Sequence, residues 1–161
     1  MAREHVYNLT VRWIGNQGSG TSAYDAYSRE HVIEGIDKRP IEGSSDPAFR
    51  GDSSRYSPED LLVASVSACH MLWYLHLCVD AGIIVVAYTD PAVGTMEVGR
   101  GGAGRFTRVT LRPEVIVEAG ADLARARSLH ELASSKCFIA NSVSFPILLE
   151  PVIKVEPIVT L

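Results

Sequence analysis

A capped and almost uniformly apolar segment, residues 57–82, limits what this chain can fold into more than any other feature of its sequence. Ser57, Pro58 and Asp60 form a typical helix start, in which the serine is the N-cap, the proline occupies the first turn and the aspartate completes a capping box. Gly82 is a suitable residue to end the helix. Because apolar residues lie on all sides between these ends, the sequence predicts a long central helix that lies in a core.

The apolar run at residues 61–79 is also long enough to be considered as a membrane span. It carries Ser65, Ser67, His70 and His76, lacks flanking basic residues and has no second segment like it in the chain. We therefore interpret it as a helix buried in protein and predict no association with a membrane.

The remainder of the chain predicts strands and a second helix around the central one. The length of 161 residues fits a single domain, residues 1–161. Its predicted parts are N-terminal strands in 1–36 (at 5–14 and 22–36), a loop rich in Gly, Pro and Ser in 37–56, the central helix in 57–82, and C-terminal strands and a helix in 83–161. Within the last part, strands are expected at 83–90, 93–98, 106–118 and 150–161, and Asp122 is expected to cap the second helix. This order indicates an α+β fold rather than a repeating βαβ fold.

Composition and charge exclude several classes of protein. Hydrophobic residues make up 47% and charged residues 21% of the chain, a balance typical of globular proteins. The formal net charge is −4 and basic residues form no run, which argues against a nucleic-acid partner. The polar start, MAREHVYNLT, is not a secretory signal, and three cysteines do not suggest an extracellular disulfide framework. We therefore expect a cytoplasmic protein.

The three cysteines are the main candidates for chemistry. Cys69 lies inside the central helix, Cys78 near its end and Cys137 at the end of the second helix. The simplest interpretation treats all three as small buried hydrophobes. Their spacing does not form a tetrahedral zinc set, and we predict no metal and no cofactor.

The histidines leave a further alternative open. His76 follows Cys69 by seven residues and His130 precedes Cys137 by seven, so each histidine shares a helix face with a cysteine. A Cys–His pair would suit a hydrolase or transferase, but hydrogen-bonded core or interface histidines are the more ordinary interpretation. Cys69 and His70 are neighbours that point about 100° apart on a helix, which makes them a poor chelate.

The residues around the central helix resemble the OsmC/Ohr family, the osmotically inducible protein C and organic hydroperoxide resistance proteins. The resemblance rests on Ser57-Pro58-Glu59 with Leu61, on Cys69 ten residues after Glu59, and on Cys137 closing the second helix. It covers nearly the whole chain. It implies an α+β fold in which antiparallel sheets wrap around long central helices, in an intertwined homodimer. Two positions depart from the family pattern: Phe138 stands where proline is usual, and His70 where many members have phenylalanine.

The resemblance also implies an activity, the reduction of organic hydroperoxides by a thiol peroxidase with an antioxidant role. Cys69 would attack the peroxide and become a sulfenic acid, Cys137 would close a disulfide with it, and an external dithiol, of lipoyl type in some members, would reduce the enzyme. A buried thiol has a raised pKa, so the site needs a cation, which the family supplies as an arginine from the loop before the helix. Arg50 is the best match, with Arg55 and Arg29 as competitors, and Glu59 is the expected carboxylate partner.

Helix geometry adds one independent inference about assembly. Ten residues of helix span about 15 Å, so Glu59 and Cys69 of one chain cannot share a small site if the helix is continuous. Two copies of the helix packed antiparallel in a homodimer would bring Glu59 and Arg50 of one chain to Cys69 of the other.

Three functions remain open from the sequence. The first is an organic hydroperoxide reductase, in which an apolar site favours alkyl or lipid hydroperoxides over hydrogen peroxide. The second is a non-catalytic thiol redox sensor or small-ligand binding protein on the same fold, and the third is the Cys–His hydrolase or transferase. Cys78 is interpreted as a packing residue in each of them.

Overall fold

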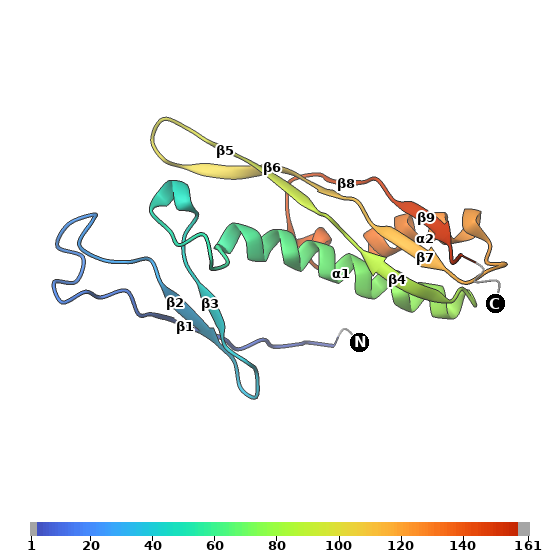
Figure 1. Ribbon diagram of the computed structural model, residues 1–161, viewed down its shortest axis with the longest axis horizontal. Coiled ribbons are helices and arrows are strands. Elements are labelled where there is room, and N and C mark those ends of the chain that lie inside the picture. The colour runs from blue at the N-terminus through green and yellow to red at the C-terminus, as the bar shows by residue number, and fades with distance from the viewer. Residues whose placement is uncertain (1–2, 158–161) are drawn as a thin grey trace. The chain divides into compact units, whose positions relative to one another are not determined.

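The computed structural model describes residues 3–157, and these form a mixed α and β structure (Figure 1). The elements in chain order are β1 (Thr10–Trp13), β2 (His31–Glu34), β3 (Ile41–Gly43), the 3-10 turn η1 (Pro47–Phe49), α1 (Pro58–Asp80), β4 (Val85–Thr89), β5 (Val93–Val98), β6 (Gly104–Leu111), β7 (Glu114–Val117), α2 (Leu123–Lys136), the 3-10 turn η2 (Ala140–Ser142), β8 (Ile147–Leu149) and β9 (Val152–Val155). The α+β fold class is confirmed.

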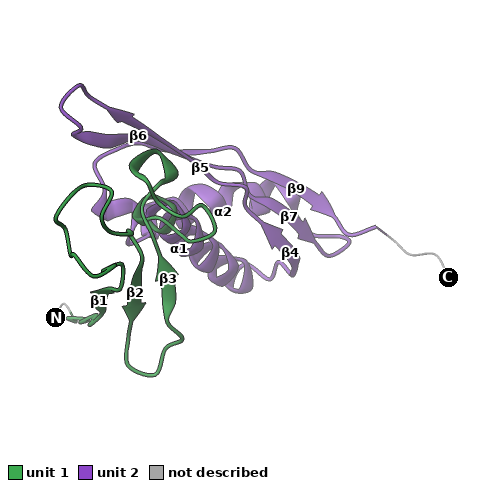
Figure 2. Ribbon diagram, turned by 60° about the vertical axis from the view of Figure 1, so that its left-hand side comes forward, with its two compact units in different colours: residues 1–61 green, residues 62–161 purple. Residues whose placement is uncertain are grey.

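The chain divides into two compact units, residues 1–61 and residues 62–161 (Figure 2). The boundary falls in the first turn of α1, so this helix belongs almost entirely to the second unit. The prediction that residues 1–161 form a single domain stays a prediction.

The first unit is built on an antiparallel sheet in the order β1-β2-β3. Its middle strand pairs with β1 through Val11 and Ile33 and with β3 through His31 and Gly43. One or two short strands were expected within 22–36, and the structure has one there, β2. The structure corrects the prediction for 37–56, because the region predicted as a loop contains both β3 and η1.

The segment between β3 and α1 is ordered by its own short polar side chains. Asp46 caps η1 by accepting a hydrogen bond from the Ala48 N–H at 2.7 Å, and its carbonyl accepts one from the Gly51 N–H at 3.1 Å. The Ser44 hydroxyl oxygen accepts a hydrogen bond from the Asp52 N–H at 3.0 Å. These local bonds give the segment a defined conformation although it is rich in residues that favour loops.

Helix α1 begins with the predicted capping box. The Ser57 hydroxyl oxygen accepts a hydrogen bond from the Asp60 N–H at 3.1 Å, and the Asp60 carboxylate accepts one from the Ser57 N–H at 2.9 Å. The helix ends at Asp80, two residues before the predicted limit, and Gly82 follows with a φ of 69°. That left-handed conformation lets the Ile83 N–H reach the Cys78 carbonyl at 2.9 Å, so the glycine ends the helix as expected.

The second unit holds both helices and two three-stranded sheets, in the orders β4-β7-β9 and β5-β6-β8. The single strand predicted at 106–118 is in fact two strands in different sheets, because Pro113 separates β6 from β7 and has no N–H to continue the ladder. The predicted final strand corresponds to β9, and its last residues, 158–161, lie outside the described part of the chain. The sequence did not predict β8.

The main core of this unit lies between α1, α2 and the β4-β7-β9 sheet. Tyr74, Leu77 and Cys78 from α1 meet Val115 and Val117 from β7 there. Cys78 is 1% exposed in this cluster.

The burial of α1 differs from the sequence prediction. Its buried residues form one side of the helix: Val66, His70, Tyr74, Leu77 and Cys78. Leu72 and Val79 point elsewhere and are 63% and 76% exposed. The helix therefore lies in the core of this chain on one side only. By length and composition alone α1 also meets the criterion for a membrane-spanning helix, a test that core helices of globular proteins pass as well.

Candidate functional site

The two cysteines predicted to act together lie against each other between α1 and α2. Cys69 is half-buried on α1, whereas Cys137 is fully buried and forms the C-cap of α2. Both are free thiols, and they are close enough for the Cys69 thiol to influence the pKa of Cys137. The fold thus brings together two thiols that are 68 positions apart in sequence.

The surroundings of Cys137 favour its neutral thiol form. Burial is the largest cause that raises the pKa of Cys137, and the neighbouring Cys69 thiol raises it further. The Ala140 N–H donates a hydrogen bond to its Sγ at 3.4 Å and partly opposes this effect. Cys137 is therefore a poor nucleophile at neutral pH, which suits a residue that reacts second.

A buried pair of histidines lies beside the thiols and joins the same two helices. Nε2 of His70 and Nδ1 of His130 are 3.0 Å apart and share a hydrogen bond, and each residue is only 1% exposed. Burial is the largest cause that lowers the pKa of His70, opposed by the charge of Asp90. The pKa of His130 is lowered to about 3, mainly by burial and also by His70 and Arg127. Both rings are therefore neutral at pH 7.

From the sequence, each of these histidines is expected to be an ordinary hydrogen-bonded core or interface residue. The structure agrees that they are hydrogen-bonded in the core, but it shows that they are partners of each other. The sequence suggested Cys–His pairs instead. In the structure His130 pairs with His70, and His76 lies 3.6 Å from Asp80 at the exposed end of α1.

The three candidate arginines all lie in the first unit, and they differ in how they are held. Arg29 donates to the carbonyls of Tyr27 and Tyr24 at 2.6 and 2.7 Å and lies over both rings. Arg55 pairs with carboxylates of Glu42 and Asp52 at 3.3 and 3.5 Å.

Arg50 differs from both because its side chain makes neither an ion pair nor a hydrogen bond within residues 3–157. Its guanidinium carbon lies 5.8 Å from the centre of the Tyr24 ring. Its φ is 64°, a conformation that is costly for a residue with a side chain and is found often at functional sites. Of the three, Arg50 is thus the guanidinium left available to a ligand.

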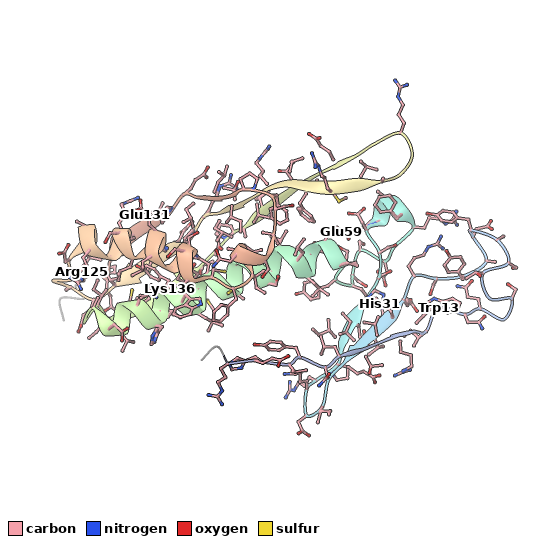
Figure 3. The ribbon with its side chains drawn as sticks, turned by 180° about the vertical axis from the view of Figure 1, so that it is seen from behind. Trp13, His31, Glu59, Arg125, Glu131 and Lys136 are labelled. Carbon is pink, nitrogen blue, oxygen red and sulfur yellow. The ribbon has the colours of Figure 1, made fainter. Side chains whose placement is uncertain are left out.

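Glu59 lies in the first turn of α1, as the figure with side chains shows (Figure 3). Its Oε2 atom is buried and has no hydrogen-bond partner among the described residues. Since α1 is continuous, the ten residues from Glu59 to Cys69 span about 15 Å, and these two groups of one chain do not meet in a small site.

Aromatic side chains follow each thiol closely in sequence, Trp73 one turn after Cys69 and Phe138 next to Cys137. The Trp73 ring makes edge contacts with Phe138 at 5.6 Å and with His76 at 5.8 Å. The Lys136 ammonium, near the end of α2 in Figure 3, lies 5.6 Å from the centre of the Trp73 ring. A shallow hollow of about 200 Å³ is lined by Leu72, Trp73 and His76. Trp73 and Phe138 therefore form an aromatic contact near the thiols, with the Lys136 ammonium on the Trp73 ring.

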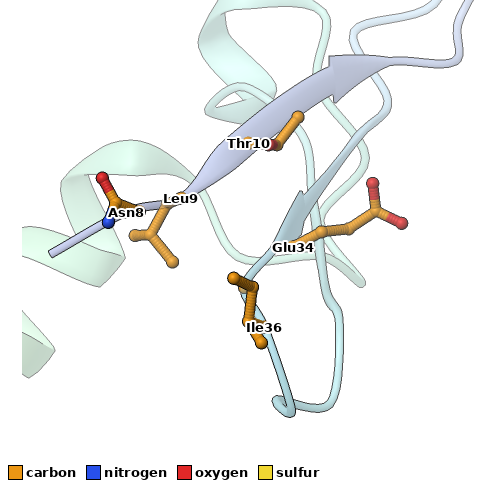
Figure 4. Close-up of a pocket in the computed structure, with 6 residues that line it drawn as sticks. Asn8, Leu9, Thr10, Glu34 and Ile36 are labelled. Carbon is orange, nitrogen blue, oxygen red and sulfur yellow. The ribbon is translucent and has the colours of Figure 1, made fainter.

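A larger hollow lies elsewhere, in the first unit (Figure 4). It has a volume of about 390 Å³ and is lined by Asn8, Leu9, Thr10, Glu34, Gly35 and Ile36. It contains no thiol and none of the predicted site residues, so we assign it no chemistry. Within residues 3–157 there is also no cluster of three or more His, Cys, Asp or Glu side chains arranged to hold a metal ion.

Comparison with known proteins identifies the family. The model of the OsmC-like protein family matches residues 51–151, which include α1 and both thiols of the pair. The chain belongs to the OsmC-like protein family. The resemblance seen in the sequence is thus confirmed. No curated protein matches this sequence.

Solved structures of several bacterial proteins share the fold. An OsmC-like protein of unknown function from Vibrio cholerae is 30% identical, with a TM-score of 0.83 over 92% of this chain and 100% of that chain. An OsmC-like protein from Mycoplasma pneumoniae is 14% identical, with a TM-score of 0.72 over 94% of this chain and 99% of that one. An organic hydroperoxide resistance protein from Elizabethkingia anophelis is 17% identical, with a TM-score of 0.66 over 96% of this chain and 100% of that one.

Proposed function

We propose that this OsmC-like protein is a thiol-dependent peroxidase that reduces organic hydroperoxides to alcohols. The observation that carries the proposal is the contact between a half-buried thiol, Cys69, and a fully buried one, Cys137, at the junction of two helices. Family membership and the fold shared with an organic hydroperoxide resistance protein support it.

The proposed reaction has three balanced steps. The Cys69 thiolate attacks the distal peroxide oxygen, the O–O bond breaks, and the alkoxide leaves and takes up a proton as an alcohol. The Cys69 sulfenic acid then condenses with Cys137: an S–S bond forms and water leaves. An external dithiol, such as a lipoyl group, gives two electrons and two protons to reopen the disulfide.

Arg50 and Glu59 complete the proposed site from a second copy of the chain. Arg50 would hold the Cys69 thiolate and the leaving oxygen, and the unpartnered Oε2 of Glu59 would hold the guanidinium. The separation of about 15 Å along α1 requires two chains for this arrangement, and the exposed apolar residues of α1, Leu72 and Val79, are available to form the contact between them. We therefore infer a homodimer. In keeping with the sequence, we propose that it acts in the cytoplasm, with no membrane and no nucleic acid as partner.

The decisive experiment measures consumption of cumene hydroperoxide with dihydrolipoamide as reductant. We expect multiple turnovers in wild type, none in Cys69→Ser, and at most one peroxide per chain in Cys137→Ser. Cys78→Ser is the matched control, because this third cysteine lies in the core and takes no part in the reaction. A wild type that consumes no more than one peroxide per chain would contradict the enzyme proposal and favour a redox sensor.

Mixing inactive variants tests whether the site is shared between chains. Cys69→Ser and Arg50→Ala are each expected to be inactive alone. A mixed dimer would contain one complete site, with Cys69 from one chain and Arg50 from the other, so random exchange should restore about a quarter of the wild-type activity. A mixture that stays inactive after exchange has been verified would show that both groups must belong to one chain.

A further inference from the structure

The hydrogen bond between His70 and His130 is the directional contact between the two helices that carry the thiols. α1 and α2 are both fully described, and between their side chains the structure shows this one hydrogen bond apart from the contact of the two thiols themselves. The other contacts between these helices are apolar in the main core, and the Lys136 ammonium of α2 lies over the Trp73 ring of α1. Apolar contacts tolerate small sliding movements, whereas a hydrogen bond of 3.0 Å is lost when its atoms move apart by less than 1 Å.

The two rings are also fixed from the side. The Tyr74 ring lies on the His130 ring with 3.8 Å between centres and 11° between planes. The His70 ring is parallel to the His130 ring within 6°. Tyr74 follows His70 by one helical turn, so His130 is held by two consecutive positions on the same side of α1.

The thiols lie on the same pair of helices. Cys69 immediately precedes His70 on α1, and Cys137, the C-cap of α2, follows His130 by two turns. A disulfide forms without strain only when the two Cβ atoms lie about 3.5–4.5 Å apart. Disulfide formation therefore tolerates a displacement of the two helices about as small as the histidine hydrogen bond does.

We propose that His70 and His130 are positioning residues, whose mutual hydrogen bond fixes α2 against α1 in the placement that lets Cys69 and Cys137 form their disulfide. Nε2 of His130 is already buried without a partner among the described residues, and breaking the bond would leave Nε2 of His70 and Nδ1 of His130 in the same state, which opposes any shift of the helices. This inference deepens the proposed function and rests on its use of the two thiols.

The test measures the disulfide directly and uses no hydroperoxide. The reduced protein is equilibrated with mixtures of oxidised and reduced dithiothreitol. Two electrons and two protons then pass from the protein thiols to the reagent, whose S–S bond breaks while the Cys69–Cys137 bond forms. Mass spectrometry of the trapped protein gives the equilibrium constant and the rate of closure.

The variants separate the hydrogen bond from packing. His70→Gln and His130→Asn each keep a polar atom near the position of the ring nitrogen that makes the hydrogen bond, Nε2 in His70 and Nδ1 in His130. His70→Phe/His130→Phe removes both partners and leaves apolar rings. We expect the equilibrium constant for closure to fall at least about tenfold in the double phenylalanine variant and to stay within about threefold of wild type in His70→Gln and His130→Asn.

Three results would overturn the proposal. The first is a double phenylalanine variant that closes its disulfide as wild type does. The second is a loss in His70→Gln as large as in that variant. The third needs no variant: in wild type labelled with ¹⁵N-histidine, a scalar coupling between the two nitrogens should report the bond, and its absence in the folded reduced protein would show that the bond is not formed.

The same experiment distinguishes this inference from the proposed function. A wild-type protein that forms no Cys69–Cys137 disulfide at any ratio of dithiothreitol would remove the two-thiol reaction itself. A wild type that closes normally, with variants that close equally well, would remove only the role of the histidines.

Discussion

The two buried histidines should make the protein markedly less stable in mild acid. An unfolded chain protonates histidine with a pKa of about 6.5, so at pH 5 each histidine that stays neutral in the folded state costs about 2 kcal/mol of stability. His130, whose pKa is lowered to about 3, remains neutral at pH 5 and contributes this amount in full. The pKa of His70 is also lowered, with Asp90 opposing, so His70 contributes a further 0 to about 2 kcal/mol.

The sign of the effect follows from proton uptake. Below pH 6.5 the unfolded state binds more protons than the folded one. The two histidines therefore cost no stability above that pH, and the free energy of unfolding falls as the pH is lowered from 6.5 towards 3. We expect the free energy of unfolding of wild type, measured in urea at a fixed protein concentration, to fall between about pH 7.5 and pH 5. The fall should exceed that of His70→Phe/His130→Phe by about 2–4 kcal/mol.

The comparison with the double variant isolates the histidines. Carboxylates and other groups titrate in both proteins and cancel in the difference. His76→Gln, which removes an exposed histidine instead, is the matched control and should behave as wild type does. If the double variant loses as much stability on acidification as wild type, or if neither changes, the two rings are not held neutral in the fold and the reasoning fails.

Three further predictions concern α1 and the core. Ser57→Ala should lower the free energy of unfolding by about 1 kcal/mol through loss of the N-cap, whereas the exposed Ser53→Ala should leave it unchanged in urea titrations. Leu72→Lys should shift sedimentation from dimer towards monomer, because it places a charge on the exposed apolar side of α1, whereas Leu132→Lys on α2 should not. A Leu72→Lys protein that sediments as a dimer would exclude this side of α1 as the contact between the chains. Ala126→Leu should destabilise the protein by about 1–3 kcal/mol in the same titrations, because Ala126 is fully buried among the helices and β7, and a neutral result would mean that the core has room there.

The helices were predicted well because local chemistry decides where they begin and end. The capping box at Ser57, the cap at Asp122 and the glycine after α1 act within a few residues, and each is present in the structure. The strands were predicted less well because tertiary pairing decides them. β3 lies in a stretch rich in loop residues and forms by pairing with β2, and β8 forms by pairing in parallel with β6.

The site was predictable to the extent that it lies in a motif. Cys69 and Cys137 were identified by resemblance to a family, and the structure brings them together. The bond between His70 and His130 has no comparable signal, because 60 residues separate the two and their pairing depends on how α2 packs on α1. The one clue was that His70 departs from the phenylalanine common in the resembling family, at the position next to the thiol.

The mixed burial of α1 differs from the burial on all sides that its sequence predicts. A helix that is apolar on all sides predicts burial on all sides, but the sequence does not state which molecule provides the cover. In this chain, α2 and the sheets cover the side of Val66, His70 and Tyr74, and leave Leu72 and Val79 exposed. The same helix separates Glu59 from Cys69 by about 15 Å. A second copy of the chain would account for both observations, because it would cover the exposed side of α1 and supply a Glu59 carboxylate near Cys69. Loss of the dimer and loss of activity should therefore occur together in any variant of that side.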